Sequence, residues 1–205
     1  MKFLRWLIMA FGLGIIFCLI VIITPVDKTP LNESRYYQLA QQKLDSLNSS
    51  YTLQNSKYFK AGWAKTNITP HYPLPLAGYG ARKGAIVSTV RDSVWARGFV
   101  FDNGFKKSAI ITLDALIIPP AVTETLRILL PEIGYSLDNI FLSATHTHCS
   151  VGGWADSWIG TQFAGKYQNE IVSDLANAII TTIKKAETEL VNAKVGFARY
   201  DASPF

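Results

Sequence analysis

The chain has 205 residues, of which 49% are hydrophobic and 17% are charged, a length that suits one or at most two domains. This apolar share excludes a globally disordered chain, and two cysteines are too few for a disulfide scaffold. The formal net charge is +5, but Lys2 and Arg5 precede a hydrophobic run, which leaves 18 of the 20 basic residues against 15 acidic ones. Such a small excess is not the clustered basic footprint of a nucleic-acid-binding protein, so we expect no nucleic-acid partner.

The first element is Trp6–Val26, a hydrophobic run without a charged residue. As a helix rising ~1.5 Å per residue, this run spans the roughly 30 Å hydrocarbon core of a bilayer. Lys2 and Arg5 flank its N-terminal end, so the positive-inside rule predicts a cytoplasmic N-terminus and an extracytoplasmic C-terminal domain, periplasmic or extracellular. No small-x-small cleavage site follows the run, which favours a retained anchor over a cleaved signal peptide. We therefore expect residues 1–27 to form a cytoplasmic stub and a single-pass transmembrane signal anchor.

Residues 28–60 follow as a linker and a stalk helix. Asn32 or Ser34 can cap this helix, because their side chains accept hydrogen bonds from the first free N–H groups. The apolar residues that fall on one face of the helix are Tyr37, Ala40, Leu44 and Leu47.

Residues 61–205 alternate strand and helix patterns after a Pro/Gly-rich opening. Val94–Phe101 and Ser108–Leu113 are rich in β-branched and aromatic residues, and Asp102-Asn103-Gly104 between them predicts a hairpin. The pattern then predicts a helix that starts at Pro119-Pro120, runs to Ile133 and is followed by Gly134. Asn139–Thr145 is the next strand, so strand, helix and strand form a crossover unit.

A second helix is predicted over Phe163–Leu190, and Val191–Phe197 alternates as a final strand. The chain halts soon afterwards without a closing element. The fold class is therefore α/β: an N-terminal transmembrane helix followed by a layered domain of mixed sheet with flanking helices, truncated at its C-terminus. The buried stripe of the second helix is predicted to consist of Ile171, Leu175, Ile179 and Ile183.

The most informative motif is the segment Ser143–His148, which reads Ser-Ala-Thr-His-Thr-His. His146 and His148 are two residues apart, so on an extended strand both side chains project to the same side. Imidazoles placed in this way can bind one metal ion, and zinc suits such ligands. The alternative is a pair of hydrogen-bonding histidines at a strand end, and the spacing alone leaves both open. The chain has only three histidines, and the presence of two in this motif favours the metal site.

Four other residues could contribute a ligand, each with a plainer explanation. His71 lies in a proline-rich segment and Asp156 between two tryptophans, and for both a loop role is the favoured interpretation. Asp114 ends a strand, where its carboxylate either reaches a neighbouring site or makes a cap or loop hydrogen bond. Cys149 could ligate zinc as a thiolate, although a side chain that turns away is favoured. A catalytic zinc needs about three protein ligands, so the sequence presents part of a metallohydrolase site.

Five segments of the chain stand in the order seen in the neutral/alkaline non-lysosomal ceramidases, and the chain resembles the N-terminal part of that family's catalytic domain. These segments are Ala61–Pro70, Leu76–Gly80, Trp95–Arg97, Leu113–Asp114 and Ser143–His148. The resemblance implies that residues 61–205 are the N-terminal portion of a catalytic domain, with its remaining zinc ligands and active-site serine further along, in a missing C-terminal portion.

The activity implied by this resemblance is that of a membrane-anchored, zinc-dependent amidohydrolase, which cleaves the N-acyl amide of ceramide to sphingosine and a fatty acid. It makes His146 a ligand of Zn²⁺ and His148 a catalytic residue that positions the substrate. The implied partners are a ceramide-like lipid and the membrane. Two alternatives stay open: a catalytically incomplete anchored fragment, or a related zinc hydrolase that acts on a different amide or ester.

Overall fold

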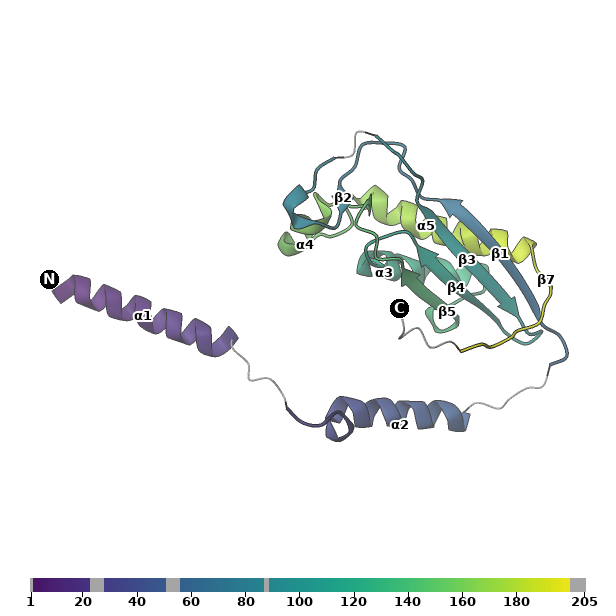
Figure 1. The fold of residues 1–205 in the computed structure, drawn as a ribbon, viewed down its shortest axis with the longest axis horizontal. Coiled ribbons are helices and arrows are strands. Elements are labelled where there is room, and N and C mark those ends of the chain that lie inside the picture. The colour runs from purple at the N-terminus through teal and green to yellow at the C-terminus, as the bar shows by residue number, and fades with distance from the viewer. Residues whose placement is uncertain (1, 23–27, 51–55, 87–88, 200–205) are drawn as a thin grey trace. The chain divides into compact units, whose positions relative to one another are not determined.

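The computed structural model describes residues 2–22, 28–50, 56–86 and 89–199. These fall into two units, with the boundary between Gln54 and Asn55 (Figure 1).

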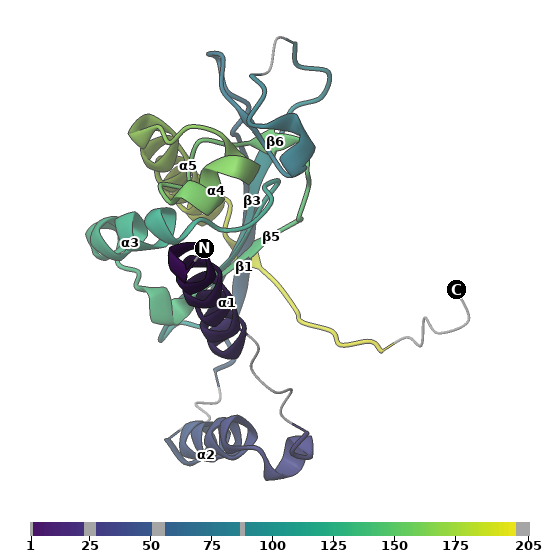
Figure 2. The same ribbon diagram turned by 90° about the vertical axis from the view of Figure 1, so that its left-hand side faces the viewer.

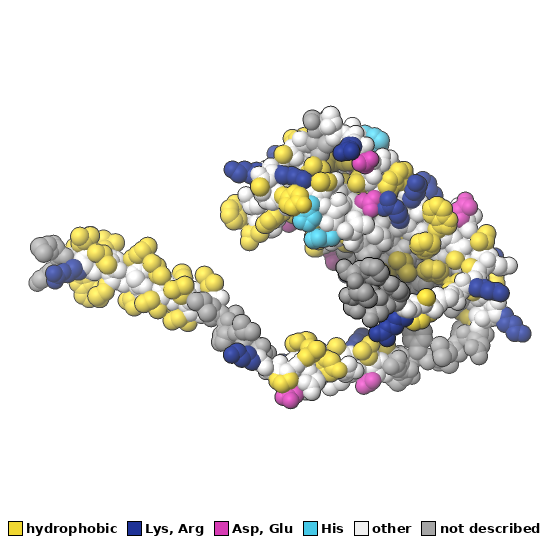
Figure 3. All heavy atoms as spheres, viewed as in Figure 1, with side chains coloured by type: hydrophobic (Ala, Val, Ile, Leu, Met, Phe, Trp, Pro, Cys, Tyr) yellow, Lys and Arg dark blue, Asp and Glu magenta, His cyan; other side chains and the backbone are white. Residues whose placement is uncertain are grey.

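The first unit begins with one long apolar helix, α1 (Lys2–Ile22). Hydrophobic side chains cover it along the face shown in Figure 3. Within it, Phe3–Ile22 is long and apolar enough to cross a membrane, a property shared by anchors and signal sequences. The sequence therefore correctly predicts an apolar helix at the N-terminus.

The second element of this unit is helix α2 (Arg35–Ser50), which follows the short 3-10 turn η1 (Leu31–Glu33). Ser34 joins the two, since its hydroxyl donates to the carbonyl of Leu31 at 2.6 Å and its own carbonyl accepts from the Gln38 N–H at 3.1 Å. The predicted helix after Ser34 is thus confirmed.

The second unit is built on a five-stranded mixed sheet in the order β5-β4-β3-β1-β7. Its neighbours pair antiparallel except β4 and β5, which are parallel and connected by helix α3. The predicted hairpin and crossover unit are both present. The strands are β1 (Lys60–Asn67), β3 (Trp95–Asp102), β4 (Lys107–Leu113), β5 (Ile140–Ala144) and β7 (Val191–Asn192).

A second, two-stranded sheet pairs β2 (Leu76–Ala77) with β6 (Ser150–Val151). Leu76 lies opposite Val151, and Ala77 lies opposite Ser150. This pairing brings the Pro/Gly-rich segment beside the residues that follow the two histidines.

The first helix of this unit matches its prediction closely. Helix α3 (Pro120–Leu129) continues as the 3-10 turn η3 (Leu130–Ile133) and ends at Gly134, whose φ of 78° is the left-handed conformation of a helix C-cap. A further 3-10 turn, η4 (Leu137–Asn139), precedes β5.

The helix predicted over residues 163–190 is present as α5 (Asn169–Thr188), but it starts six residues later than expected. A separate short helix, α4 (Trp158–Ala164), precedes it. Gly165 separates them with φ +75° and lies so close to Pro75 that an added Cβ would be 2.3 Å from the proline Cβ. The predicted final strand is also shorter than expected, because only Val191–Asn192 pairs with β1.

The hydrophobic core lies between the sheet and helices α3 and α5, which Figure 2 shows together on the same side of the strands. Helix α5 contacts β1, β3 and α3. The predicted stripe of α5 is confirmed, since all four of its residues are buried. The largest fully buried side chains include Val100, Ile111, Leu113, Leu126, Ile171, Ile179 and Ile183.

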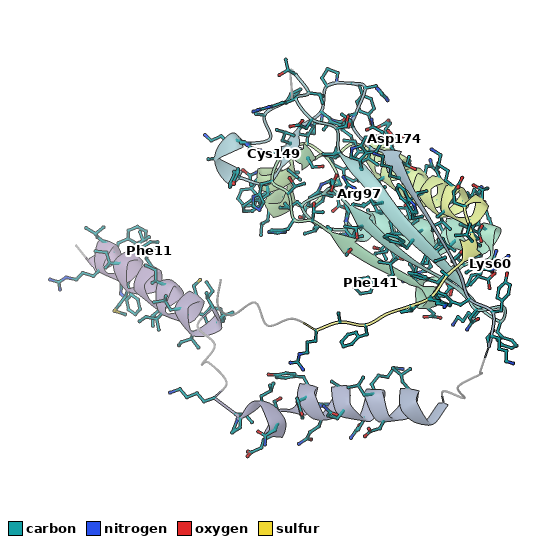
Figure 4. All side chains as sticks on the ribbon, turned by 45° about the vertical axis from the view of Figure 1, so that its right-hand side comes forward. Phe11, Lys60, Arg97, Phe141, Cys149 and Asp174 are labelled. Carbon is teal, nitrogen blue, oxygen red and sulfur yellow. The ribbon has the colours of Figure 1, made fainter. Side chains whose placement is uncertain are left out.

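The opposite face of the sheet carries a row of exposed apolar residues across four strands. The strand register places Trp63 opposite Phe99, Phe99 opposite Ile110, and Ile110 opposite Phe141. All four side chains are exposed within the described part of the chain. Figure 4 labels Phe141 on β5 and Arg97 on β3, and Arg97 lies two register positions nearer to the histidines than this row.

Candidate metal centre

The two histidines lie in the loop that follows β5, not on the strand itself. The strand ends at Ala144, and Thr145 extends its pairing by donating its N–H to the Leu113 carbonyl at 2.9 Å. His146 then takes φ +58°, the left-handed region, which costs a non-glycine residue of order 1 kcal/mol. The prediction that strand alternation aligns the pair is therefore wrong. A backbone turn at His146 brings the imidazoles together instead, with ring centroids 5.0 Å apart.

The ring of His146 is oriented by a single hydrogen bond. Its Nδ1 lies 2.8 Å from the carbonyl oxygen of Leu116, in the connection between β4 and α3. A carbonyl only accepts, so Nδ1 is the protonated nitrogen and Nε2 carries the free lone pair. An Nδ1–H bonded to a backbone carbonyl is the usual outer contact of a metal-binding histidine, because it fixes both tautomer and ring direction.

The ring of His148 is held by packing. Its Nδ1 is buried and has no hydrogen-bond partner among the described residues. The Tyr79 ring lies 4.7 Å from it between centroids, and the His146 ring meets it edge-on. Gly78, with φ +129°, presses on the same residue, since a Cβ there would be 2.8 Å from the His148 Cβ. Two neighbouring imidazoles are donors of the kind that zinc takes, although a catalytic zinc has about three protein ligands.

The remaining candidate ligands do not complete this site. Among the residues that the structure describes, no three His, Cys, Asp or Glu side chains come together in a group that could hold a metal ion. Cys149 is exposed, and its Sγ accepts from Arg82 Nη2 at 3.3 Å. His71 and Asp156 are exposed loop residues, as the sequence favours.

Asp114 has a structural role on the neighbouring strand. Its carboxylate accepts from the Trp95 N–H at 3.0 Å and from Arg97 Nη1 at 2.6 Å. Its carbonyl accepts from the Ser150 hydroxyl, which ties the end of β4 to β6. The carboxylate thus neither reaches the histidines nor caps helix α3.

A cavity of about 710 Å³ adjoins the histidine loop. This size suits a small-molecule ligand. Its lining includes Thr147 and Cys149 from the loop, His71 and Tyr72 from the Pro-rich segment, and the charged residues Arg91 and Asp92. The apolar lining residues include Leu74, Leu76, Val94 and Val151. Figure 4 labels Cys149 in the loop beyond the end of the sheet.

Sequence reasoning misses Tyr79, Arg82 and the Leu116 carbonyl as neighbours of the histidines. The glycine pair around Tyr79 signals only a turn, and the structure indeed has the 3-10 turn η2 (Gly80–Arg82). Nothing in the local sequence indicates that this turn packs on residue 148, which lies 66 positions away from Arg82.

Solved structures with a similar fold come from ceramidases. Neutral ceramidase from Pseudomonas aeruginosa matches 68% of this chain with a TM-score of 0.60 and 21% identity. A ceramidase structure described as complexed with C2 matches 66% of it, with a TM-score of 0.60 and 22% identity. The chain spans only 23% and 22% of the length of these proteins, so the likeness concerns the fold of one part of them.

The family comparison agrees with the fold and covers most of the second unit. The model of the neutral/alkaline non-lysosomal ceramidase N-terminal region matches residues 59–202, which include every strand of the sheet, helices α3 to α5 and both histidines of the candidate centre. The chain therefore belongs to the neutral/alkaline non-lysosomal ceramidase family.

Proposed function

We propose that this chain provides the first part of the zinc centre of a ceramidase-type amidohydrolase, with His146 as a zinc ligand and His148 beside it in the substrate pocket. The observation that carries the proposal is the fixed tautomer of His146, whose Nδ1 is engaged by the Leu116 carbonyl. This leaves Nε2 free to bind the metal, 5.0 Å between ring centroids from a second imidazole. Family membership supports the same assignment.

The reaction is hydrolysis of the N-acyl amide of a ceramide-like lipid. Water adds across the carbon–nitrogen bond: the acyl carbon takes the hydroxyl group and leaves as a fatty acid, and the amine nitrogen takes the proton and leaves as sphingosine. Zn²⁺ supplies Lewis acidity toward the carbonyl oxygen. His148 stands beside the site, and its Nδ1, which has no hydrogen-bond partner among the described residues, can hydrogen-bond to and orient a polar group of the substrate.

Helix α1 fits a role in bringing this site to its lipid substrate. Its apolar span can act as a membrane anchor, with Lys2 and Arg5 keeping the N-terminus in the cytoplasm and the second unit outside it. An extracytoplasmic site tethered to the bilayer meets a lipid without extracting it far.

Metal binding is the first test, because it does not depend on turnover. Purified chain is titrated with Zn²⁺ against a chromophoric chelator. We expect binding to be weak, to be abolished in His146→Ala, and to be reduced less in His148→Ala. His71→Ala is the matched control, because His71 is exposed in another loop and should leave the affinity unchanged. Equal losses in His146→Ala and His148→Ala would contradict the assignment.

Turnover is the second test and separates this proposal from its alternative. Fatty-acid release from labelled ceramide, abolished by a chelator and restored by Zn²⁺, supports a complete hydrolase. Zinc binding without release from any amide or ester supports instead a binding chain that needs ligands from further polypeptide. The second outcome is favoured by the donor count, since the described residues bring two imidazoles together and a catalytic zinc takes about three protein ligands.

A further inference from the structure

We infer that Arg82 is a positioning residue for His148, acting through the His148 carbonyl and the ring of Tyr79. The inference rests on the proposed function, because it concerns how the imidazole beside the proposed zinc ligand is oriented. It assigns a role to a residue that the sequence motif does not contain.

The two histidines are oriented in different ways, and this difference creates the need for Arg82. His146 is fixed by its bond to the Leu116 carbonyl at 2.8 Å. His148 makes no such bond, because its buried Nδ1 has no partner among the described residues. An imidazole without a hydrogen bond turns about its χ angles unless neighbouring atoms hold it.

Arg82 binds the chain directly after that ring's attachment point, through the His148 carbonyl and the Cys149 side chain. Its Nη1 donates to the His148 carbonyl at 2.5 Å, and its Nη2 donates to Cys149 Sγ at 3.3 Å. Two donors of one planar guanidinium thus fix consecutive residues, which a single ammonium group cannot do.

Arg82 also holds the ring that packs on His148. The carbon of its guanidinium lies 4.9 Å from the centroid of the Tyr79 ring, within cation–π range. The Tyr79 ring in turn lies 4.7 Å from the His148 ring. The Arg82 side chain therefore contacts both the backbone of residue 148 and the aromatic ring on which the His148 imidazole packs.

The turn that carries Arg82 is itself anchored. The Arg82 N–H donates to the Tyr79 carbonyl at 2.9 Å, and the Gly78 N–H donates to the Phe163 carbonyl in α4 at 2.9 Å. Gly84, just after the turn, touches Gly165, since an added Cβ would be 2.6 Å from the Cα of the latter. Arg82 can therefore transmit a fixed position from this anchored segment to the histidine loop.

Positioning and charge predict opposite effects on metal affinity. A cation near a zinc centre repels the metal, so if only the charge of Arg82 mattered, its removal would tighten binding. If Arg82 orients His148, its removal weakens binding, by no more than the loss that His148→Ala causes. The sign of the change separates the two.

The experiment measures Zn²⁺ affinity and imidazole NMR signals in the full chain and its variants. In Arg82→Gln we expect weaker Zn²⁺ binding, by no more than the loss in His148→Ala, a changed ring signal for His148 and an unchanged one for His146. The double variant with His148→Ala should bind no more weakly than His148→Ala alone, because both changes remove the same contribution. Arg82→Lys should restore only part of the affinity. Lys83→Gln, which removes the neighbouring exposed cation, is the matched control.

The possible outcomes separate a failure of the proposed function from a failure of the positioning role of Arg82. If the wild-type chain binds no Zn²⁺, the proposed function fails, and the apo NMR signal of His148 in Arg82→Gln still tests the positioning. If the wild type binds and Arg82→Gln binds equally or more tightly with an unmoved His148 signal, the positioning role is overturned. Losses that add to those of His148→Ala, with both ring signals moved, would mean that Arg82 only holds the loop together, which also overturns it.

Discussion

Arg97 and Asp114 face each other where β3 begins and β4 ends, with guanidinium Nη1 2.6 Å from carboxylate Oδ1. The same carboxylate accepts a hydrogen bond from the Trp95 N–H, so the Asp114 side chain binds both the backbone at the start of β3 and the Arg97 guanidinium. Asp114 is the more buried partner, and its carbonyl also accepts from Ser150. This residue joins the end of the sheet to the strand that follows the histidine loop.

Asp114→Ala should lower the free energy of unfolding by about 1.5–3 kcal/mol, because it removes hydrogen bonds to a charged acceptor and leaves a backbone N–H unpaired. The measurement is chemical denaturation followed by tryptophan fluorescence. Glu124→Gln is the control. Both side chains of the Glu124–Arg127 ion pair are more than 60% exposed, so this pair contributes about 0.5 kcal/mol or less to the stability. Equal losses in the two variants would show that the Asp114 contacts are weak.

Gly78→Ala should damage the histidine loop more than a glycine replacement in open space. At Gly78 a Cβ meets the His148 Cβ at 2.8 Å and its Cα and O at 2.9 Å, in a backbone conformation of φ +129°. Gly134 also has positive φ, yet nothing lies within 4 Å of an added Cβ. Gly134→Ala thus measures the conformational cost alone, about 1 kcal/mol.

We expect Gly78→Ala to destabilise the protein by more than Gly134→Ala, and to weaken Zn²⁺ binding as His148 is displaced. Gly134→Ala should leave zinc affinity unchanged. Thermal unfolding and zinc titration of both variants give the answer, and an unaltered His148 environment in Gly78→Ala would contradict the close approach.

Local chemistry predicts the parts of the fold that depend on neighbours in sequence. The hairpin after Asp102 follows from its turn residues, and the end of α3 follows from Gly134. The buried face of α5 follows from the helical spacing of its isoleucines and leucine. Each of these signals is complete within about twenty residues.

The parts that the sequence misses depend on distant contacts. Strand β1 carries Ala61, Gly62 and Ala64, small residues that give little strand signal, and it forms because β3 and β7 flank it. The break between α4 and α5 depends on the approach of Gly165 to Pro75. For the same reason the motif identifies the histidine pair but not the contact between His148 and Arg82.

Ile179→Ala should be among the most destabilising single changes in the second unit. Ile179 is 0% exposed in the core between α5 and the sheet, and removing its methyl and methylene groups leaves a cavity. The expected loss is about 2–5 kcal/mol. Ile128→Ala, at a 72% exposed position of helix α3, should change the stability by about 0.5 kcal/mol or less. Denaturant midpoints with unchanged slope measure both, and similar midpoints would place Ile179 outside the core.

Tyr135 should make the stability depend on alkaline pH. Burial, followed by the charge of Glu187, raises the pKa of Tyr135 above its usual value of 10, and its hydroxyl donates to Glu187 Oε1 at 3.1 Å. The folded state therefore favours the neutral phenol. The stabilisation that Tyr135 provides is fully present below pH 10 and is lost as the pH rises beyond this value. Glu187 also binds Lys107, and this hydrogen bond raises the pKa of Lys107. A second contribution to the stability is therefore lost above about pH 10.5.

Tyr135→Phe should flatten the fall in unfolding free energy above pH 10 without abolishing it. Tyr36→Phe, at an exposed position, should keep the wild-type profile, and an equally steep fall in Tyr135→Phe would show that this phenol is not responsible.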